Sequence, residues 1–158
     1  MRAMFLLFAA LFFVSPALAG PLPDEIPGWR TLRTPHDYKT LVQRVDAAVE
    51  ESPINIVTRA SATIGAKNLG LTIPGNMVVG VYGPQFAVRM LEASIAAGIE
   101  APLRLYLTEN ADGTATLSYK LPSFVFAPYF ADGGEKLESL AAELDDILAA
   151  IADRAAAP

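Results

Sequence analysis

The spacing of apolar residues near the start of the chain predicts a strand followed by a helix. Between residues 38 and 51 the apolar side chains recur every three or four positions, which is the stripe of an amphipathic helix. We expect Thr34 to cap this helix and Pro35 to be its first residue, because these residue types favour those positions. A short strand is expected before it, at residues 29–33.

Shorter apolar runs predict four more strands. Residues 54–59 are rich in β-branched side chains, and residues 76–82 are almost continuously apolar, which favours a strand buried on both faces. Residues 103–108 and 114–121 alternate between apolar and polar positions. The Ala-Asp-Gly sequence between them is a strong turn signal, so these two strands are predicted to form a hairpin.

Three further helices complete the predicted order. Ser61 is expected to cap a helix at 62–69, and another helix is expected to span 84–98. A long apolar stripe at 135–156, after a hinge at 132–134, predicts a C-terminal helix. The order β-α-β-α-β-α-β-β-α lacks strict alternation. We therefore predict an α+β fold, in which a single curved sheet of about five strands has helices packed on one face.

The N-terminus has the three parts of a secretory signal peptide. A positive start is followed by an unbroken apolar run at residues 4–14 and by a small-residue cleavage site ending at Ala19. We predict a signal peptide at 1–19, a linker at 20–28 and a single α+β domain at 29–157. The apolar run is too short to span a bilayer. The expected location is therefore periplasmic or secreted in a bacterium, with no membrane span after cleavage.

The composition removes several classes of function. The 158 residues include no cysteine and one histidine, and the net charge is −5. Disulfides, thiol nucleophiles and multi-histidine metal sites are therefore excluded, and no metal or cofactor is predicted. The excess of acidic residues argues against nucleic acid as a partner, because such binding needs cations to neutralise phosphates. The histidine, His36, is expected at the exposed start of the first helix, where a catalytic role is disfavoured.

The strongest candidate ligand site lies where the strand at 76–82 meets the next helix. Its residues are Tyr82, Gly83, Pro84, Phe86 and Arg89. A helix that starts directly after a buried strand presents free backbone N–H groups, which can hold an anion. The spacing lacks the repeated glycines of a phosphate-binding loop, and it also fits an ordinary strand-to-helix turn.

An aromatic segment at residues 124–130 is a second candidate. Phe124 and Phe126 are included as ligand contacts, because such a segment can line an apolar pocket. The same segment also fits a subunit contact, where aromatic residues are enriched, or core packed beneath the last helix.

Three cations fall within predicted strands. They are Arg59, Arg104 and Lys120. Cations on a sheet face can hold a carboxylate or a sulfate. The alternative is that they lie on the solvent face and pair with acidic residues such as Glu109.

Several short motifs make the chain resemble the bacterial domain-of-unknown-function 302 family over residues 28–129. They are Gly28-Trp29-Arg30-Thr31, Ala66-Lys67-Asn68-Leu69-Gly70-Leu71, Tyr82-Gly83 at a strand end, Ala101-Pro102-Leu103-Arg104, and Asp112-Gly113 followed by Ser118-Tyr119. The resemblance implies an α+β fold similar in layout to the TATA-binding-protein-like class, and a tendency to form homodimers. The family has no settled function.

The chain departs from the family pattern at two places. Ser61-Ala62 stands where the family often has Asp-His, and Tyr82-Gly83-Pro84-Gln85 stands where it often has Phe-Gly-Asn-Pro. Those polar positions are the family's best candidates for a shared site. A ligand bound there by other members would therefore be lost or changed in this chain.

The sequence favours an exported, non-catalytic domain that binds an unknown small ligand or a periplasmic protein. One alternative is a structural, dimeric module of the cell envelope. Another is an enzyme of an unrecognised type, which is disfavoured because the folded body shows no carboxylate pair at informative spacing, no metal-ligand pattern and no G-x-S-x-G motif.

Overall fold

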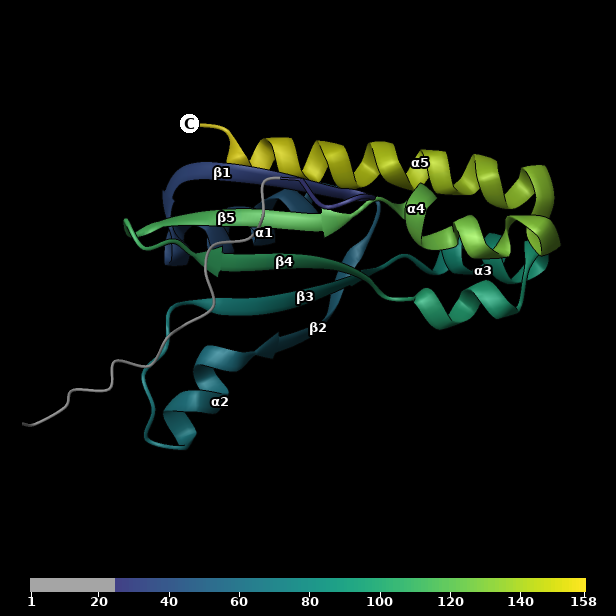
Figure 1. The fold of residues 1–158 in the computed structure, drawn as a ribbon. Helices are drawn as coiled ribbons and strands as arrows, with labels where there is room; N and C mark the ends of the chain where they lie inside the picture. Colours follow the sequence, from purple (N-terminus) through teal and green to yellow (C-terminus); the bar gives the residue numbers. More distant parts are fainter. Residues whose placement is uncertain (1–24) are drawn as a thin grey trace, which may run out of the picture.

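A computed structural model describes residues 25–158, which contain one five-stranded antiparallel sheet in the order β1-β5-β4-β3-β2 (Figure 1). The strands are β1 (Trp29–Asp37), β2 (Asn55–Ser61), β3 (Asn76–Tyr82), β4 (Leu103–Glu109) and β5 (Thr114–Lys120). The predicted α+β fold class and the order of its elements are confirmed. The predicted signal peptide at 1–19 and most of the predicted linker lie outside the described residues.

Helices cover one face and one end of the sheet (Figure 1). α1 and α5 pack against each other and against the strands, and α3 and α4 contact α5. No helix within residues 25–158 combines the length and the apolar character needed to cross a bilayer. The helices are α1 (Tyr38–Glu50), α2 (Ala62–Asn68), α3 (Pro84–Ala93), α4 (Pro122–Phe126) and α5 (Phe130–Ala156), with short 3₁₀ segments η1 (Ala96–Glu100) and η2 (Ala127–Tyr129).

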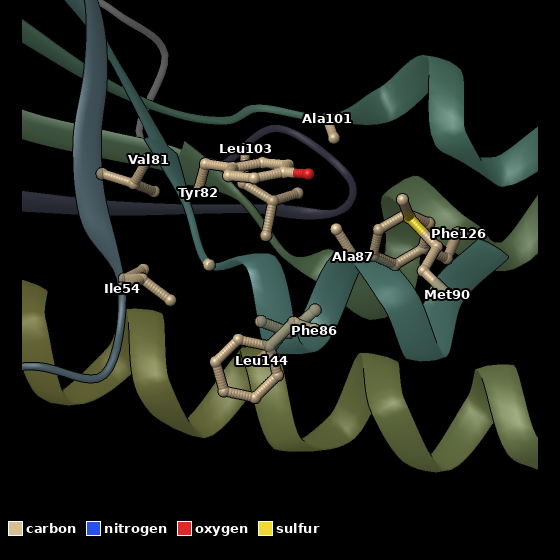
Figure 2. Close-up of a pocket in the computed structure, with 11 residues that line it drawn as sticks. Ile54, Val81, Tyr82, Phe86, Ala87, Met90, Ala101, Leu103, Phe126 and Leu144 are labelled. Carbon is tan, nitrogen blue, oxygen red and sulfur yellow. The ribbon is translucent and has the colours of Figure 1, made fainter. Parts of the chain in front are cut away.

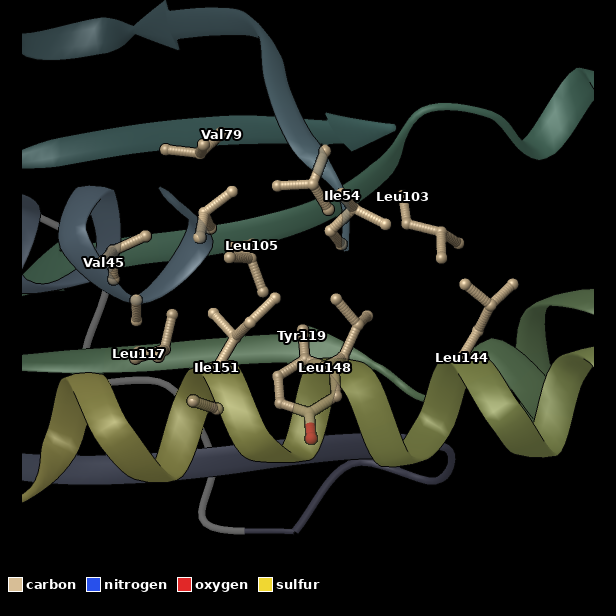
Figure 3. Packing of buried hydrophobic residues seen from close by; sticks show 14 of the residues in the cluster. Val45, Ile54, Val79, Leu103, Leu105, Leu117, Tyr119, Leu144, Leu148 and Ile151 are labelled. Atoms are coloured by element: carbon tan, nitrogen blue, oxygen red, sulfur yellow. The ribbon is translucent and has the colours of Figure 1, made fainter. Parts of the chain in front are cut away.

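The core lies between the sheet and helices α1 and α5 (Figure 3). Val45 of α1 and Leu148 and Ile151 of α5 point toward the central strands, where they meet Leu105 and Leu117. All five side chains are at most 2% exposed. Burial of each such side chain contributes roughly 1.5–3 kcal/mol. The apolar side chains that recur along these helices and strands thus face one common layer.

The first helix begins later than predicted. α1 starts at Tyr38, and its N-cap is Asp37 rather than Thr34. The buried hydroxyl of Thr34 donates to the carbonyl oxygen of Ala115 in the neighbouring strand, at 2.8 Å, so the chain continues as a strand here. Asp37 Oδ1 accepts the backbone N–H of Thr40 at 2.7 Å, and this bond lowers the pKa of the Asp37 carboxyl.

Pro35 and His36 therefore lie in β1 and not in a helix. Proline fits this strand because β1 is at the edge of the sheet and its pairing with β5 is irregular at this point. The Nε2 atom of His36 lies 2.7 Å from the carbonyl oxygen of Ala157, near the end of the chain. The predicted position of this histidine at a helix start is wrong.

Two other local predictions are refined by the structure. The strand at 76–82 forms as β3, but only Val79, Gly80 and Val81 are fully buried, because the antiparallel sheet leaves its second face open. The hinge at 132–134 is a break inside α5, where Gly134 has a φ of 55° that glycine adopts without a Cβ clash. α5 therefore begins before the hinge.

Candidate functional site

Three of the five residues predicted at the end of β3, namely Tyr82, Gly83 and Phe86, line a small pocket beneath the turn into α3 (Figure 2). This pocket, which we call the closed pocket because its side chains leave little free space, has a volume of about 30 Å³. One water molecule needs about 10–15 Å³, whereas small-molecule sites occupy roughly 300–1,000 Å³. The pocket is thus a packing gap rather than a site for an organic ligand. Its lining is Ile54, Val81, Tyr82, Gly83, Phe86, Ala87, Met90, Ala101, Leu103, Phe126 and Leu144.

The structure brings Tyr82, Gly83, Phe86 and Phe126 together around the closed pocket. Phe86 is 7% exposed and Phe126 is 1% exposed, so both belong to the hydrophobic core. Of the three interpretations left open for the aromatic segment, core packing therefore describes Phe126.

The other predicted site residues lie outside that lining. Pro84 is the exposed first residue of α3. The guanidinium of Arg89 forms an ion pair with Glu143 of α5, with an N–O distance of 2.7 Å. Phe124 is half exposed, and its ring covers Gly28 so closely that a Cβ there would lie 2.1 Å from the ring. These residues do not converge on one place.

The N-terminus of α3 offers little to an anion. Pro84 has no N–H, and the N–H groups of Phe86 and Ala87 both donate to the carbonyl oxygen of Gly83, at 3.0 and 3.1 Å. At most the N–H of Gln85 is left to face a ligand. The geometry gives little support to the expected anion contact at this turn.

A larger groove lies on the face of the sheet opposite α1 and α5. This open-face groove has a volume of about 420 Å³, within the range of small-molecule sites. Most of its residues occupy the alternate strand positions between those that face the core. Its lining is Trp29, Asn76, Val78, Glu100, Leu103, Arg104, Tyr106, Tyr119, Lys120 and Val125.

Strand register places two cations and an indole side by side in this groove. Trp29 of β1 pairs with Lys120 of β5. Leu105 of β4 pairs with Tyr119 of β5, so the adjacent residues Arg104 and Lys120 stand opposite each other. The Lys120 ammonium lies 5.8 Å from the centroid of the Trp29 ring, a cation–π distance. Trp29, Lys120 and Arg104 therefore lie in one row across this face of the sheet.

The next row across the same face supplies hydroxyl groups. Tyr106 of β4 pairs with Ser118 of β5 and with Val78 of β3. The Tyr106 hydroxyl accepts a hydrogen bond from Asn76 Nδ2 at 2.6 Å, which leaves its own proton available to a ligand. Ser118 is fully buried, and its hydroxyl has no hydrogen-bond partner among the described residues. A fully buried hydroxyl without a partner is unusual in a folded protein.

The strand cations differ in how their charges are balanced. Arg59 forms an ion pair with Asp46 of α1 at 2.7 Å. Arg104, by contrast, has neither an ion pair nor a hydrogen bond within residues 25–158. Glu109, the acid suggested as a surface partner, instead accepts the backbone N–H of Gly75 at 2.6 Å.

One carboxylate lines the groove. Oε1 of Glu100 accepts the hydroxyl of Tyr129 at 2.8 Å, and this bond raises the pKa of the Tyr129 phenol. The phenol of Tyr119, which also lines the groove, has its pKa raised by burial. The described lining holds no histidine and no second carboxylate. Its side chains offer binding contacts but no nucleophile with an adjacent general base.

Sequence reasoning marked Arg104 and Lys120 as sheet-face cations but missed their neighbours Trp29, Val78 and Tyr106. One signal was present, because the alternation over residues 103–108 puts Arg104 and Tyr106 on one face. The missing information was the strand order, which sets β1 beside β5 and so brings the indole to the cations.

The antiparallel sheet has helices packed on one face and the groove on the other, and this arrangement defines a small α+β domain. The chain belongs to the DUF302 family, described as "Domain of unknown function DUF302", whose sequence profile matches residues 30–155. This confirms the resemblance seen in the sequence motifs. A crystal structure of an uncharacterized conserved DUF302 protein from Bacillus stearothermophilus has the same fold, with a TM-score of 0.72 and 20% identity over 82% of this chain and 99% of that chain.

Curated relatives resemble this chain over part of their length. A protein of Brucella suis biovar 1 named fluoride-specific ion channel FluC 1 is 24% identical over 98 residues, which is 62% of this chain and 39% of that protein. A protein of the same name from Brucella abortus biovar 1 is 24% identical over 98 residues, or 36% of its length. The chain thus spans less than two fifths of these relatives.

Proposed function

We propose that this chain is an exported, non-catalytic domain that binds a small ligand in the open-face groove. The observation that carries the proposal is the groove itself, whose volume of about 420 Å³ suits a small organic molecule. Its lining mixes apolar and aromatic surface with a few polar groups, which is the usual composition of such a site. The closed pocket is too small for the same role.

A binding role fits the groove better than catalysis does. Acid–base catalysis needs a group whose proton can be exchanged near the operating pH and that faces the reacting atom. The titratable side chains of the described lining are Glu100, Arg104, Tyr106, Tyr119 and Lys120. Glu100 already holds the Tyr129 hydroxyl, and the phenol of Tyr119 titrates above its ordinary pKa.

Export is supported by the N-terminal sequence alone. A positive start, an apolar run at residues 4–14 and a small-residue site ending at Ala19 are the parts of a signal peptide. The intact mass of protein recovered from the periplasm should correspond to a chain that lacks residues 1–19. A membrane-retained species that still carries residues 4–14 would contradict this part of the proposal.

The groove can be tested through its tryptophan. Trp29 is the single tryptophan of the chain, so its indole N–H resonance reports on the groove directly. We expect phenylacetate or phenylacetamide, added at millimolar concentration to protein obtained by expressing the full chain, to shift this resonance. The Val78→Phe substitution narrows the groove and should abolish the shift.

Val88→Phe is the matched control for that substitution. Val88 is 56% exposed on α3 and does not line the groove, so this variant should bind both probes as the wild type does. The proposal is wrong if neither probe shifts the Trp29 resonance, or if Val78→Phe binds the probes unchanged.

A protein partner is a second candidate, favoured by exposed apolar side chains after α3. Ile95 and Ile99, in the stretch that follows α3, are 80% and 78% exposed. Exposed apolar patches often mark protein contacts. In the relatives named as fluoride channels, a similar segment is part of a longer protein. This arrangement suits a role in protein contacts.

Sizing with light scattering tests whether the partner is a second copy. A homodimer formed through this patch should dissociate in the Ile95→Ser, Ile99→Ser double variant and should persist in Leu69→Ser. Leu69 is a control because it is 78% exposed but lies at the end of α2. If the wild-type chain stays monomeric at tens of micromolar, the homodimer is ruled out.

A further inference from the structure

We infer that the open-face groove is specific for a monocarboxylate with a flat, apolar body, and that the carboxylate lies between Arg104 and Lys120. This inference rests on the proposed ligand-binding function of the groove. It follows from three properties of the lining: a pair of cations that has no ion-pair partner within residues 25–158, aromatic and aliphatic walls beside it, and a single carboxylate, that of Glu100.

The cation pair is unusual because it is unfavourable by itself. Like charges directly opposite on neighbouring strands destabilise a sheet, and the register sets Arg104 opposite Lys120. Other strand arginines form ion pairs with carboxylates: Arg30 pairs with Asp153, and Arg59 pairs with Asp46.

Arg89 and Arg154 also pair with carboxylates, Glu143 and Glu51. Arg44 donates to the carbonyl oxygens of residues near the C-terminus. Within residues 25–158 Arg104 has no such partner. A bound anion would supply the missing counter-charge, and the planar guanidinium fork suits a carboxylate.

The walls of the groove select the rest of the ligand. Lys120 lies over the Trp29 ring, and Val78 and Val125 add aliphatic surface. A flat apolar group placed against these side chains would lose water-exposed surface while its carboxylate met the cations. The Tyr106 hydroxyl, held by Asn76 Nδ2, retains a proton to donate to a carboxylate oxygen.

The charge of the lining favours one negative charge on the ligand. Arg104 and Lys120 contribute two positive charges, and Glu100 contributes one negative charge. A monocarboxylate would leave this set neutral. A dianion such as a phosphonate would leave it negative and would also face the Glu100 carboxylate, which is already fixed by the Tyr129 hydroxyl.

Three probes that share a benzyl group test this inference. They are phenylacetate, its neutral isostere phenylacetamide and the dianion benzylphosphonate, each titrated into the wild-type protein while the Trp29 indole resonance is followed. We expect phenylacetate to bind at least tenfold more tightly than phenylacetamide and more tightly than benzylphosphonate. Its affinity should fall as salt is raised, because the contact is between exposed charges.

Two matched variants then locate the carboxylate. Arg104→Gln should weaken phenylacetate binding at least tenfold and leave phenylacetamide binding unchanged, whereas Arg59→Gln should change neither affinity. Arg59 is a strand arginine outside the groove lining, so it controls for loss of an arginine as such. Arg104 is exposed and has no partner within residues 25–158, so we expect its variant to fold, and a thermal melt verifies this.

The outcomes separate the inference from the proposed function. Equal affinities for phenylacetate and phenylacetamide, both sensed by Trp29, would overturn the carboxylate specificity and leave a ligand-binding groove. Tighter binding of benzylphosphonate would assign the cations to a dianion instead. No response of Trp29 to any probe would overturn both the inference and the proposed function.

Discussion

The closed pocket and the open-face groove share Leu103 but are otherwise built from different surroundings. The closed pocket gathers side chains from β3, α3, α4 and α5 that are mostly apolar, and they pack against one another (Figure 2). The groove gathers Trp29, Arg104, Tyr106 and Lys120 from strand positions on the face of the sheet opposite α1 and α5. Aromatic residues gather in both regions, so what distinguishes the candidate site is the charge of Arg104, which has no ion-pair partner within residues 25–158.

The largest expected effect distinguishes the two phenylalanines of the aromatic segment. Phe126 is 1% exposed and lines the closed pocket, so Phe126→Ala should lower the free energy of unfolding by about 3–5 kcal/mol. Phe124 is 47% exposed, and Phe124→Ala should cost about 1 kcal/mol. Urea unfolding of both variants measures the difference. Equal losses would mean that the segment is packed uniformly.

A smaller effect is expected at the turn between β3 and α3. A Cβ at Gly83 would lie 2.7 Å from the Phe86 ring and 3.0 Å from a methyl group of Ile54, so Gly83→Ala should cost roughly 1–3 kcal/mol through overpacking. Gly65 in α2 has no atom within 4 Å of the same position, and Gly65→Ala should stabilise the protein by about 0.5–1 kcal/mol. Opposite signs in the two melts support the closed pocket as tight core. A neutral Gly83→Ala would show spare room there.

Tyr119 lines the groove and also belongs to the hydrophobic core, and its ionisation should appear only in alkali. Burial raises the pKa of its phenol, and the nearby Arg30 guanidinium acts in the opposite direction. The unfolded chain therefore loses this proton at lower pH than the folded chain, and stability is retained below pH 10 and lost as the pH rises above it.

The Tyr119→Phe substitution isolates this effect. The variant should lose less stability than the wild type between pH 9 and 11, measured as the decline of the melting temperature with pH. Parallel declines would show that other groups dominate, and Tyr38, whose pKa burial also raises, is the next residue to test.

The sequence predicted most of the fold because its elements depend on local periodicity. β3 and α2 formed where expected, and the Ser61 hydroxyl accepts the Ile64 N–H as a predicted helix cap should. The cap at Thr34 failed because a hydrogen bond to a distant strand overrode the local preference. No local pattern reports such a partner, which is 81 residues away along the chain.

The candidate site was harder to predict for the same reason. The alternation in β4 located Arg104 and Tyr106 on one face, and the predicted hairpin brings the strand of Lys120 beside them. Nothing local indicated that Trp29 would lie beneath Lys120. A groove on a sheet face is defined by strand order and register. These depend on contacts between residues that are remote in sequence.

The smallest effects are expected for two strand arginines: Arg59, which pairs with a carboxylate, and Arg104, which has no such partner within residues 25–158. Arg59→Gln removes an exposed ion pair with Asp46 and should lower stability by about 0.2–1 kcal/mol. Arg104→Gln removes one of two cations that stand opposite each other on neighbouring strands. In the absence of ligand it should therefore raise stability, by an amount of the same order of magnitude. Both differences should shrink at high salt, because exposed charges are screened over about 10 Å at 0.1 M. Melting both variants at low and high salt measures the two signs. A loss for Arg104→Gln as large as that for Arg59→Gln would mean that Arg104 stabilises the fold, and its place in the groove would then need no ligand to explain it.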